Sequence, residues 1–446
     1  MRKKAPAPLA PPAPLLSVMV LVVVAWFALA QAHADDFTVS PGESIAAKIK
    51  DLKPGDTLTI KPGIYKETLD LPALKGTEAA PITIKGERGA TLQAGRDGIR
   101  FSNDAGASWV VIDGLRITGA RDAGVFLNSS DHVTLRNLVC AKNATWGIHT
   151  RKSDYITVEN CDLSGSNLQH GLHFSSTDHP VARNNRIHDN AGCGILLTGE
   201  KAEGGDGLIT GAVIENNRIY SNGSNAGSAA ISLAGVEKSV IANNLIYFNR
   251  GDGIVNAAGD IGHAGSANQF YNNTVYFRPG EGGFALQLAA GTKDAAVMNN
   301  IFVGGKAAAF AVDPDSIAGL KSNCNIFFQP DGKDPVEPQR GVRMNLKTWQ
   351  GIMKQDVRSL VLDPQFWNPA GRDFHLKATS KAIHAGIKGP VDKDIDGKPR
   401  PADGHYTLGI YEADLPPSKS VPPPTGTVVK PPPTGTVVKP PPAEDP

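Results

Sequence analysis

The chain has 446 residues, with 48 glycines, 41% hydrophobic residues and only 6% aromatic residues. This length and composition are typical of a turn-rich globular protein that is long enough to bury a large core. The 45 basic and 44 acidic side chains leave a net charge of +1 at pH 7. A balance this even gives no electrostatic reason to expect a nucleic-acid or anionic-membrane partner.

Residues 1–34 have the pattern of a secretory signal peptide. Basic residues at positions 2–4 precede an apolar run from Leu15 to Ala30, and Ala32-His33-Ala34 is a small-residue cleavage site. The alternative is an uncleaved membrane anchor, but a membrane-spanning helix needs roughly 20 apolar residues and this run is shorter. We therefore expect a secreted mature chain that begins at residue 35, without a membrane span, in the periplasm, at the cell surface or outside the cell.

Residues 35–75 are predicted to form an N-terminal cap and the first strands. A short helix from Ser44 to Leu52 would place Ile45, Ile49 and Leu52 on one face, which can cover the open end of an apolar core. Such a cap matters because an uncovered strand edge pairs with other chains.

Between Asp113 and Asn325 one short phrase returns, in which asparagine precedes alternating apolar residues. Each period contains three alternating patches, which predicts three short strands per coil. Asparagine tolerates the left-handed backbone of a tight bend, and its amide can stack on the asparagine of the next coil. The helical arc of a leucine-rich repeat is missing. We therefore predict an all-β fold, a single-stranded right-handed parallel β-helix over residues 76–330, with anchors at Asn137, Asn160, Asn185, Asn217, Asn244, Asn273, Asn300 and Asn325.

Two early stretches, Pro54–Tyr65 (PGDTLTIKPGIY) and Ala80–Ile84, resemble the opening of secreted β-helix carbohydrate enzymes such as chondroitinase B and alginate lyases. Three later segments are similar to the closing segment of many such bacterial proteins: Leu362–Phe366, Asp394–Pro401 and Leu408–Glu412. The resemblance covers most of residues 37–412 and implies that residues 331–414 close the β-helix. It implies an extracellular polysaccharide as the partner. Lyases, epimerases, hydrolases and surface proteins share these segments, so the resemblance does not specify the reaction.

Residues 415–446 repeat the unit Pro-Pro-Pro-Thr-Gly-Thr-Val-Val-Lys and offer little that a core could bury. We expect a disordered, polyproline-like tail. The protein as a whole is expected to be a monomer.

The cysteines fall at different offsets within their repeats, so no two are placed to face each other on adjacent coils. We expect free buried thiols at Cys140, Cys161, Cys193 and Cys324.

Aligning the repeats places two columns of outward side chains on one sheet. The first column is Arg100, Phe126, His149, His173, Leu196, Ser232 and Val255, and the second is Ser102, Asn128, Arg151, Ser175, Thr198 and Ala234. Abstraction of the proton next to a uronate carboxylate needs cationic groups, or a metal, for the carboxylate and a base whose pKa is near the working pH. We therefore predict Lys152, Arg151, His149 and His173 as catalytic residues. The alternatives are solvent-exposed polar filler and a metal site at the histidine pair.

The run Arg151–Asn160 is similar to the lysine-serine stretch of the alginate lyase and chondroitinase B group, which implies Lys152 as the base. The chain departs from that group on the following coil, where Phe174-Ser175-Ser176 replaces an arginine-histidine pair. The Asp-Pro-His-Asp motif of mannuronan epimerases and the paired aspartates of polygalacturonases are absent from the sequence. The chain thus has the scaffold without a complete known signature.

The longer intervals of the repeat insert loops at residues 199–206 and 257–263. Insertions at one bend would build a wall beside the polar columns and turn a flat face into a groove. The predicted substrate-binding residues are Arg100, His170, Glu200, Lys201 and His263, with Asp206 and Asp260 as further loop candidates. The alternative for each is ordinary loop polarity.

An acidic column precedes successive strands, because Asp131, Asp154 and Asp178 each follow a serine or threonine. Three stacked carboxylates repel each other unless a cation or hydrogen-bond donors lie between them, which predicts a Ca²⁺ site. The alternative is that each aspartate closes a turn by accepting backbone N–H bonds.

These features predict a secreted enzyme that carries out lyase-like β-elimination on an acidic, uronate-containing polysaccharide, with C5 epimerisation as the second choice. The alternative is a non-catalytic surface or matrix protein whose β-helix binds glycan. The clustered His, Arg and Lys residues favour the enzyme, and the proline-rich tail favours the matrix protein.

Overall fold

The computed structural model describes residues 34–101, 106–201, 205–259 and 262–413. Residues 1–33 and 414–446, on which nearly all of the predicted signal peptide and tail falls, lie outside the described part. Within the described part, no helix is both long and apolar enough to cross a membrane.

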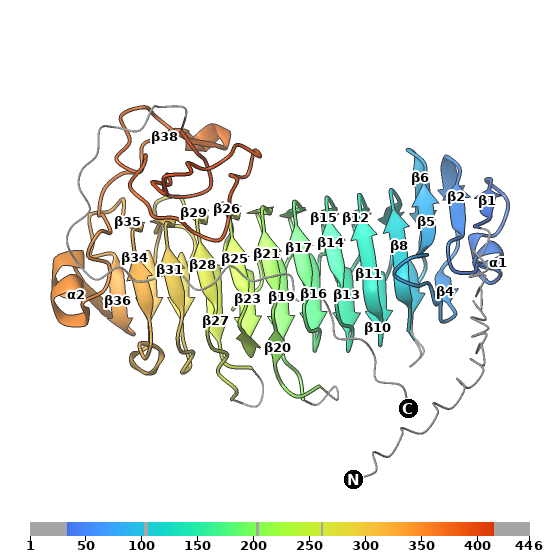
Figure 1. Cartoon of the computed structure of the whole chain (residues 1–446), viewed down its shortest axis with the longest axis horizontal. Helices are drawn as coiled ribbons and strands as arrows, with labels where there is room; N and C mark the ends of the chain where they lie inside the picture. Colours follow the sequence, from blue (N-terminus) through green and yellow to red (C-terminus); the bar gives the residue numbers. More distant parts are fainter. Residues whose placement is uncertain (1–33, 102–105, 202–204, 260–261, 414–446) are drawn as a thin grey trace, which may run out of the picture. The chain divides into compact units, whose positions relative to one another are not determined.

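Three long sheets run side by side along the chain, and each coil contributes one strand to each sheet (Figure 1). Sheet A has the order β1 (Asp36–Val39), β2 (Thr57–Ile60), β5 (Ile82–Gly86), β8 (Ser108–Asp113), β11 (Asp131–Arg136), β14 (Thr157–Glu159), β17 (Val181–Arg183), β21 (Val213–Glu215), β25 (Val240–Ala242), β28 (Gln269–Tyr271), β31 (Ala296–Met298) and β34 (Lys321–Asn323).

Sheet B follows sheet A in each coil, with the order β3 (Gly63–Tyr65), β6 (Ala90–Gln93), β9 (Arg116–Thr118), β12 (Val139–Ala141), β15 (Asp162–Ser164), β18 (Arg186–His188), β22 (Arg218–Tyr220), β26 (Leu245–Tyr247), β29 (Thr274–Tyr276), β32 (Ile301–Val303) and β35 (Ile326–Phe328). Sheet C completes the coil with β4 (Leu69–Leu71), β7 (Ile99–Phe101), β10 (Ala123–Asn128), β13 (Trp146–Arg151), β16 (Leu172–Ser175), β19 (Ile195–Thr198), β23 (Ala229–Ala234), β27 (Asp252–Ala257), β30 (Leu286–Leu288), β33 (Phe310–Val312), β36 (Val336–Gln339) and β37 (Val342–Met344). Neighbouring strands are parallel except β36 and β37, which are antiparallel.

Smaller elements flank the three sheets. They are the strand pair β20 (Ile209–Thr210) and β24 (Val236–Glu237), the antiparallel pair β38 (Phe366–Asn368) and β39 (Asp373–Leu376), the helices α1 (Ile45–Ile49) and α2 (Leu346–Met353), and the 3-10 turns Pro314–Ser316 and Pro369–Gly371. The architecture is the predicted coil of three short strands per repeat.

The apolar core lies inside the coil because successive residues of a strand point to opposite faces. In β13, for example, Ile148 and Thr150 are fully buried inside, whereas His149 and Arg151 are on the outer face. One residue of slippage would reverse this choice, so the buried face fixes the register of every coil.

Buried asparagines form a ladder at the bend between sheets A and B, as the repeat predicts, but the predicted anchors Asn137 and Asn160 are not part of it. They lie one position earlier, at the positive φ that Asn184 shares, and Leu138 and Cys161 take the place of the ladder asparagine. Each side-chain Nδ2 donates to Oδ1 of the asparagine in the next coil at 3.0 to 3.1 Å, along Asn185, Asn217, Asn244, Asn273, Asn300 and Asn325. The residue before each of these is at a positive φ in several coils, as at Asn184 (58°) and Asn216 (57°). A second ladder, Asn190–Asn222–Asn249, repeats the pattern at the next bend and was not predicted.

Both ends of the apolar core are covered by helices. Helix α1 is shorter than the predicted segment, but Ser44 caps it by accepting a hydrogen bond from the Ala47 amide, and Ile45 and Ile49 are fully buried. At the other end, α2 buries Trp349, whose Nε1 donates to the carboxylate of Asp356 at 2.9 Å.

The closing segment folds back over the outer face of sheet B, above β26, β29 and β35 (Figure 1). Its Phe374 ring lies 5.2 Å from Tyr247 and 5.3 Å from Tyr276, and these aromatic rings form part of a second apolar cluster. The closing segment also packs on sheet A, where Ile387 and Val391 join a third apolar cluster with Ala242, Tyr271 and Met298.

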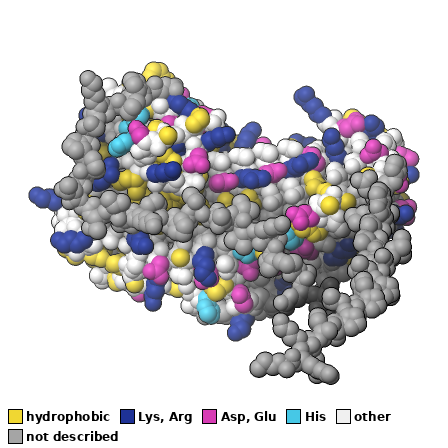
Figure 2. All heavy atoms as spheres, viewed as in Figure 1, with side chains coloured by type: hydrophobic (Ala, Val, Ile, Leu, Met, Phe, Trp, Pro, Cys, Tyr) yellow, Lys and Arg dark blue, Asp and Glu magenta, His cyan; other side chains and the backbone are white. Residues whose placement is uncertain are grey.

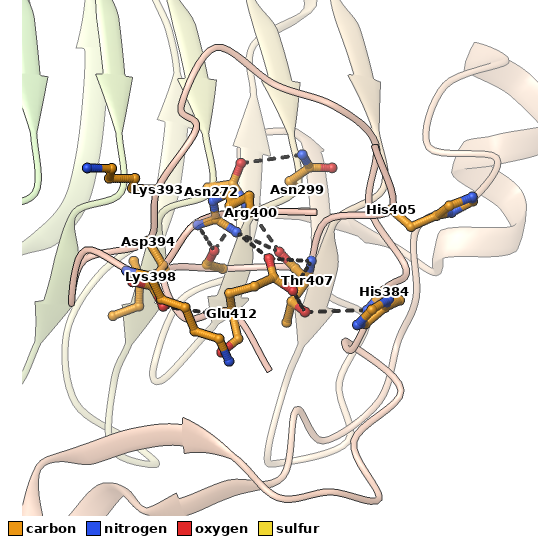
Figure 3. A network of polar contacts seen from close by, with 12 residues as sticks. Asn272, Asn299, His384, Lys393, Asp394, Lys398, Arg400, His405, Thr407 and Glu412 are labelled. Carbon is orange, nitrogen blue, oxygen red and sulfur yellow. Dashed lines mark hydrogen bonds and ion pairs between the residues drawn. The ribbon is translucent and has the colours of Figure 1, made fainter. Parts of the chain in front are cut away.

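A buried ion pair anchors this segment (Figure 3). Arg400 and Glu412 pair at 3.3 Å with side chains only 0% and 1% exposed. The Arg400 guanidinium also donates to Asn243 Oδ1 at 2.8 Å and to two carbonyls of the segment itself, Thr407 and Gly409. Asn272 donates to the same two carbonyls, so asparagines of the coil hold the closing segment by its backbone.

All four cysteines are free and buried, as expected. Burial raises the pKa of the Cys161 thiol to about 12, so this thiol is a protonated core group at neutral pH.

Candidate functional site

The strand register confirms the two predicted columns on the outer face of sheet C. His149 of β13 pairs with Phe126 of β10 and with His173 of β16, and Phe126 pairs with Arg100 of β7. In the second column Arg151 pairs with Asn128 and Ser175. Ser102, the first predicted member of that column, lies outside the described residues.

Three imidazoles meet on this face, and we call His149, His170 and His173 the imidazole cluster. The rings of His149 and His173 stack with centroids 4.8 Å apart and an interplanar angle of 3°. The ring of His170 meets that of His173 edge-on at 5.6 Å, and the indole of Trp146 lies 4.4 Å from His149. The stacking follows from the register, because facing residues of paired parallel strands lie one above the other.

Burial keeps these imidazoles neutral. Desolvation lowers the pKa of His149 to about 3, with the Arg151 guanidinium as a second cause, and it lowers the pKa of His170 to about 4. The pKa of His173 is shifted well below its usual value, first by burial and then by its two histidine neighbours. At neutral pH the cluster therefore offers lone pairs and N–H groups rather than positive charge.

The hydrogen bonds of His173 determine its tautomer. Thr198 Oγ1 donates to Glu200 Oε1 at 2.8 Å, and the same oxygen lies 2.8 Å from His173 Nε2. Because the single hydroxyl hydrogen of Thr198 is used on Glu200, Nε2 must carry the proton and donate. The lone pair of His173 is then on Nδ1, which is buried and has no hydrogen-bond partner within the described protein.

Several other polar atoms around the cluster are also buried without a hydrogen-bond partner among the described residues. They are both ring nitrogens of His149, Nε1 of Trp146 and Oγ of Ser175. Most buried polar groups in proteins are paired, and an unpaired one costs roughly 1–3 kcal/mol. A concentration of unpaired donors and acceptors on one outer face is therefore a candidate ligand site.

Two guanidinium groups lie near the Phe126 ring, Arg151 on the same strand as His149 and Arg100 on the coil before Phe126. The Arg100 guanidinium lies 4.8 Å from the ring centroid and is held by Asp97 at 2.8 Å. The Arg151 guanidinium lies 6.0 Å from the same ring, and its Nε donates to Asn128 Oδ1 at 3.0 Å. Both are planar groups of the kind that binds carboxylates through two parallel hydrogen bonds.

Lys152 lies apart from the imidazoles, at the bend that follows β13. It is exposed, adopts a positive φ of 48°, and lines a pocket of about 230 Å³ together with Asp154, Asp178 and Asp206. Burial raises the pKa of Asp178, and the charges of Asp154 and Asp206 add to this effect. The surroundings of Lys152 are thus acidic, which disfavours the approach of an acidic sugar.

The acidic column makes hydrogen bonds along the coil axis. Asp154 Oδ1 accepts from the Asp178 amide at 2.9 Å, and Asp178 Oδ1 accepts from the Thr210 amide at 2.7 Å. These bonds pair the two carboxylates with backbone N–H groups of the next coil and do not close a local turn. Within the described ranges, no group of three or more His, Cys, Asp or Glu side chains is arranged to hold a metal ion. The Ca²⁺ site at Asp131, Asp154 and Asp178 stays a prediction.

The remaining loop candidates are scattered. Glu200 accepts the hydroxyl hydrogen of Thr198, which lies beside His173. Lys201 and His263 are exposed on their loops, and Asp260 lies outside the described residues. Sequence reasoning missed Trp146 and Asp97. A signal for Trp146 was present, because an aromatic residue three positions before His149 starts the same strand.

Comparison with known proteins agrees with this architecture. The family model described as "right handed beta helix region" matches residues 88–225. The crystal structure of pectate lyase Pel9A is 17% identical, with a TM-score of 0.54, and the match covers 85% of this chain and 96% of that one. The chain is a right-handed parallel β-helix. The predicted fold is thereby confirmed.

Other solved structures share less. The A-module of Azotobacter vinelandii mannuronan C-5 epimerase AlgE6 is 14% identical over 70% of this chain and 92% of that one, with a TM-score of 0.46. The Dettilon tailspike protein is 16% identical over 65% of this chain and 62% of that one, with a TM-score of 0.42. No curated protein sequence matches the chain.

Proposed function

We propose that this protein is a secreted enzyme that cleaves an acidic, uronate-containing polysaccharide by β-elimination at the imidazole cluster. The observation that carries the proposal is the outer face of sheet C, where unpaired nitrogens of neutral histidines lie on the same face as Arg151, which shares the strand of His149, and Arg100, which is two coils before His149. An acidic polysaccharide needs both kinds of group, cations for its carboxylates and neutral bases for its ring protons. Pectate lyase Pel9A, which shares the fold, is by its name a lyase, and this supports the class of reaction.

In the proposed reaction Arg100 and Arg151 bind uronate carboxylates and stabilise the charge that develops as the C5 proton leaves. Nδ1 of His173 accepts that proton, and the electron pair forms the C4–C5 double bond as the C4–O bond breaks. An N–H of His149 donates a hydrogen bond to the departing oxygen, which takes its proton from solvent water. Glu200 acts through Thr198 to hold His173 in the required tautomer and to stabilise the imidazolium that forms.

This arrangement favours His173 over Lys152 as the base. The resemblance to alginate lyases implies Lys152, but its pocket contains three aspartates that repel a uronate. The lowered pKa of His173 is matched to a charged substrate, because a bound carboxylate raises the pKa of a neighbouring imidazole. The base then gains strength when the substrate is in place.

The second candidate function is non-catalytic glycan binding. The pKa of about 3 at His149 and of about 4 at His170 favours it, since such imidazoles are weak bases that still exchange hydrogen bonds with sugar hydroxyls. Epimerisation at C5 uses the same proton abstraction without breaking the C4–O bond. Product analysis therefore distinguishes β-elimination, epimerisation and binding without reaction.

The test incubates the purified chain with alginate, pectate, hyaluronan or chondroitin, in Ca²⁺ or in EDTA, and follows the ultraviolet absorbance of the unsaturated uronate. We expect absorbance to rise with one polymer, and His173→Asn to abolish the rise. The matched control is His263→Asn, because His263 is an exposed loop histidine. Binding without any absorbance change, and without C5 inversion by NMR, would leave the glycan-binding function in place of the lyase.

A further inference from the structure

A different surface lies on the outer face of sheet A. The aromatic ladder consists of Trp109, His132, Tyr155 and His179, one ring from each of four successive coils. Trp109 and His132 stack at 4.0 Å and 18°, His132 and Tyr155 at 4.6 Å and 15°, and Tyr155 and His179 at 4.8 Å and 12°. The rings therefore form one continuous stack parallel to the coil axis.

Each ring occupies the same strained backbone position at the bend that leads into sheet A. The φ angles are 53°, 51°, 54° and 51° for Trp109, His132, Tyr155 and His179. A side chain other than glycine or asparagine costs roughly 1–2 kcal/mol in this left-handed conformation. The following coils carry Gly211, Lys238, Ala267 and Asp294 at the same position, also with positive φ. These four coils thus carry aromatic rings at a position where the following coils carry small or polar residues.

The ladder forms one wall of a groove of about 410 Å³. Its floor is the next outward column of sheet A, Val111, Thr134, Thr157 and Val181, whose strands pair in register. Glu78 and Pro81 line it as well. The floor thus offers two neighbouring hydroxyl groups between two valines, and the wall offers aromatic rings, which is the mixture that a carbohydrate with apolar ring faces and a hydroxyl rim requires.

The charges beside the groove are already paired. In the next column Arg136 binds Asp113 at 3.0 Å and Arg183 binds Glu159 at 2.7 Å. Figure 2 shows acidic and basic side chains alternating across this face of the molecule. Among the described residues that line the groove there is one carboxylate, Glu78, and no lysine or arginine. The groove therefore lacks the cations that a uronate chain needs.

We propose that this groove binds an extended, neutral, β-1,4-linked glycan, as a site separate from the imidazole cluster on sheet C. A straight wall of stacked rings fits an extended chain, in which each sugar follows the last along one axis. The charge balance selects neutral sugars over uronates. Tyr155, which is 44% exposed, is the central contact of the ladder.

The test titrates the purified chain with cellohexaose, xylohexaose, mannohexaose and chitohexaose by calorimetry. We expect at least one of the four to bind, and Tyr155→Ser and Trp109→Ala to weaken it about tenfold or more. The matched control is Trp367→Ala, since Trp367 is 65% exposed on the closing segment. Thermal unfolding of each variant checks the fold, and Tyr155→Ser serves if Trp109→Ala does not fold.

His173→Asn should leave hexaose binding unchanged, so that loss of the lyase reaction and loss of groove binding are distinguishable. The proposal is overturned if none of the four hexaoses binds, if a hexauronate binds the groove more tightly than all of them, or if Trp367→Ala weakens binding as much as Tyr155→Ser does.

Discussion

Two regions of this protein bury ionisable groups, and they differ in how the charge is paired. Under the closing segment, Arg400 makes four hydrogen bonds, one of them to the carboxylate of Glu412, and only its Nε has no partner among the described residues. In the imidazole cluster, both ring nitrogens of His149 and Nδ1 of His173 are buried without a hydrogen-bond partner among the described residues. Paired burial holds a segment in place, whereas unpaired burial costs stability that a ligand can return.

The largest effect should come from breaking the paired region. Arg400→Met leaves the Glu412 carboxylate buried without its cation, and we expect the free energy of unfolding to fall by about 3–5 kcal/mol in a denaturant titration. Arg121→Met, at an exposed arginine, should change it by less than about 0.5 kcal/mol. Adding Glu412→Leu to Arg400→Met should recover part of the loss; a double variant less stable than the single would contradict this account.

The unpaired region should make stability depend on pH. The pKa of His149 is about 3 in the folded chain against an ordinary value of 6.5, so the unfolded chain binds more protons in this range. The contribution of His149 to the free energy of unfolding is complete above pH 6.5 and is lost progressively as the pH falls toward 3. Urea unfolding between these values should show a shallower pH slope for His149→Phe than for the natural chain. Equal slopes would mean that His149 is solvated and titrates normally.

The smallest effect should be a gain of stability. His149→Phe keeps an aromatic ring in the stack and removes two unpaired nitrogens, so we expect stability at pH 7 to stay the same or to rise by about 1 kcal/mol. The same variant should lose the lyase reaction, because no N–H remains to donate a hydrogen bond to the departing oxygen. Thermal unfolding and the absorbance assay measure the two effects on one preparation, and a marked loss of stability would assign His149 a structural role.

The fold was predictable because its signals are local and periodic. Alternation within each strand and asparagine at each bend determine which residues face outward, and the pairing of His149 with His173 followed from that phase alone. The docking of Arg400 on Asn243 joins residues 157 positions apart, and no periodic pattern reports such a contact.

The candidate site was predictable in its columns but not in its chemistry. Burial decides that His149 is neutral, and burial depends on neighbours such as Trp146 that only the folded chain brings together. The aromatic ladder was within reach of the sequence. Each of His132, Tyr155 and His179 directly follows an aspartate of the predicted acidic column, so the same alignment contained the rings.

The aromatic ladder also makes the coil a unit of length. In the proposed complex, each further coil with a ring at that bend lengthens the wall along the glycan by one ring. The ladder ends at His179, because the next coil has Gly211 at this position and glycine has no side chain to continue the stack. In a solenoid of this kind, the reach of a binding surface can lengthen or shorten through one substitution per repeat while the core is left untouched.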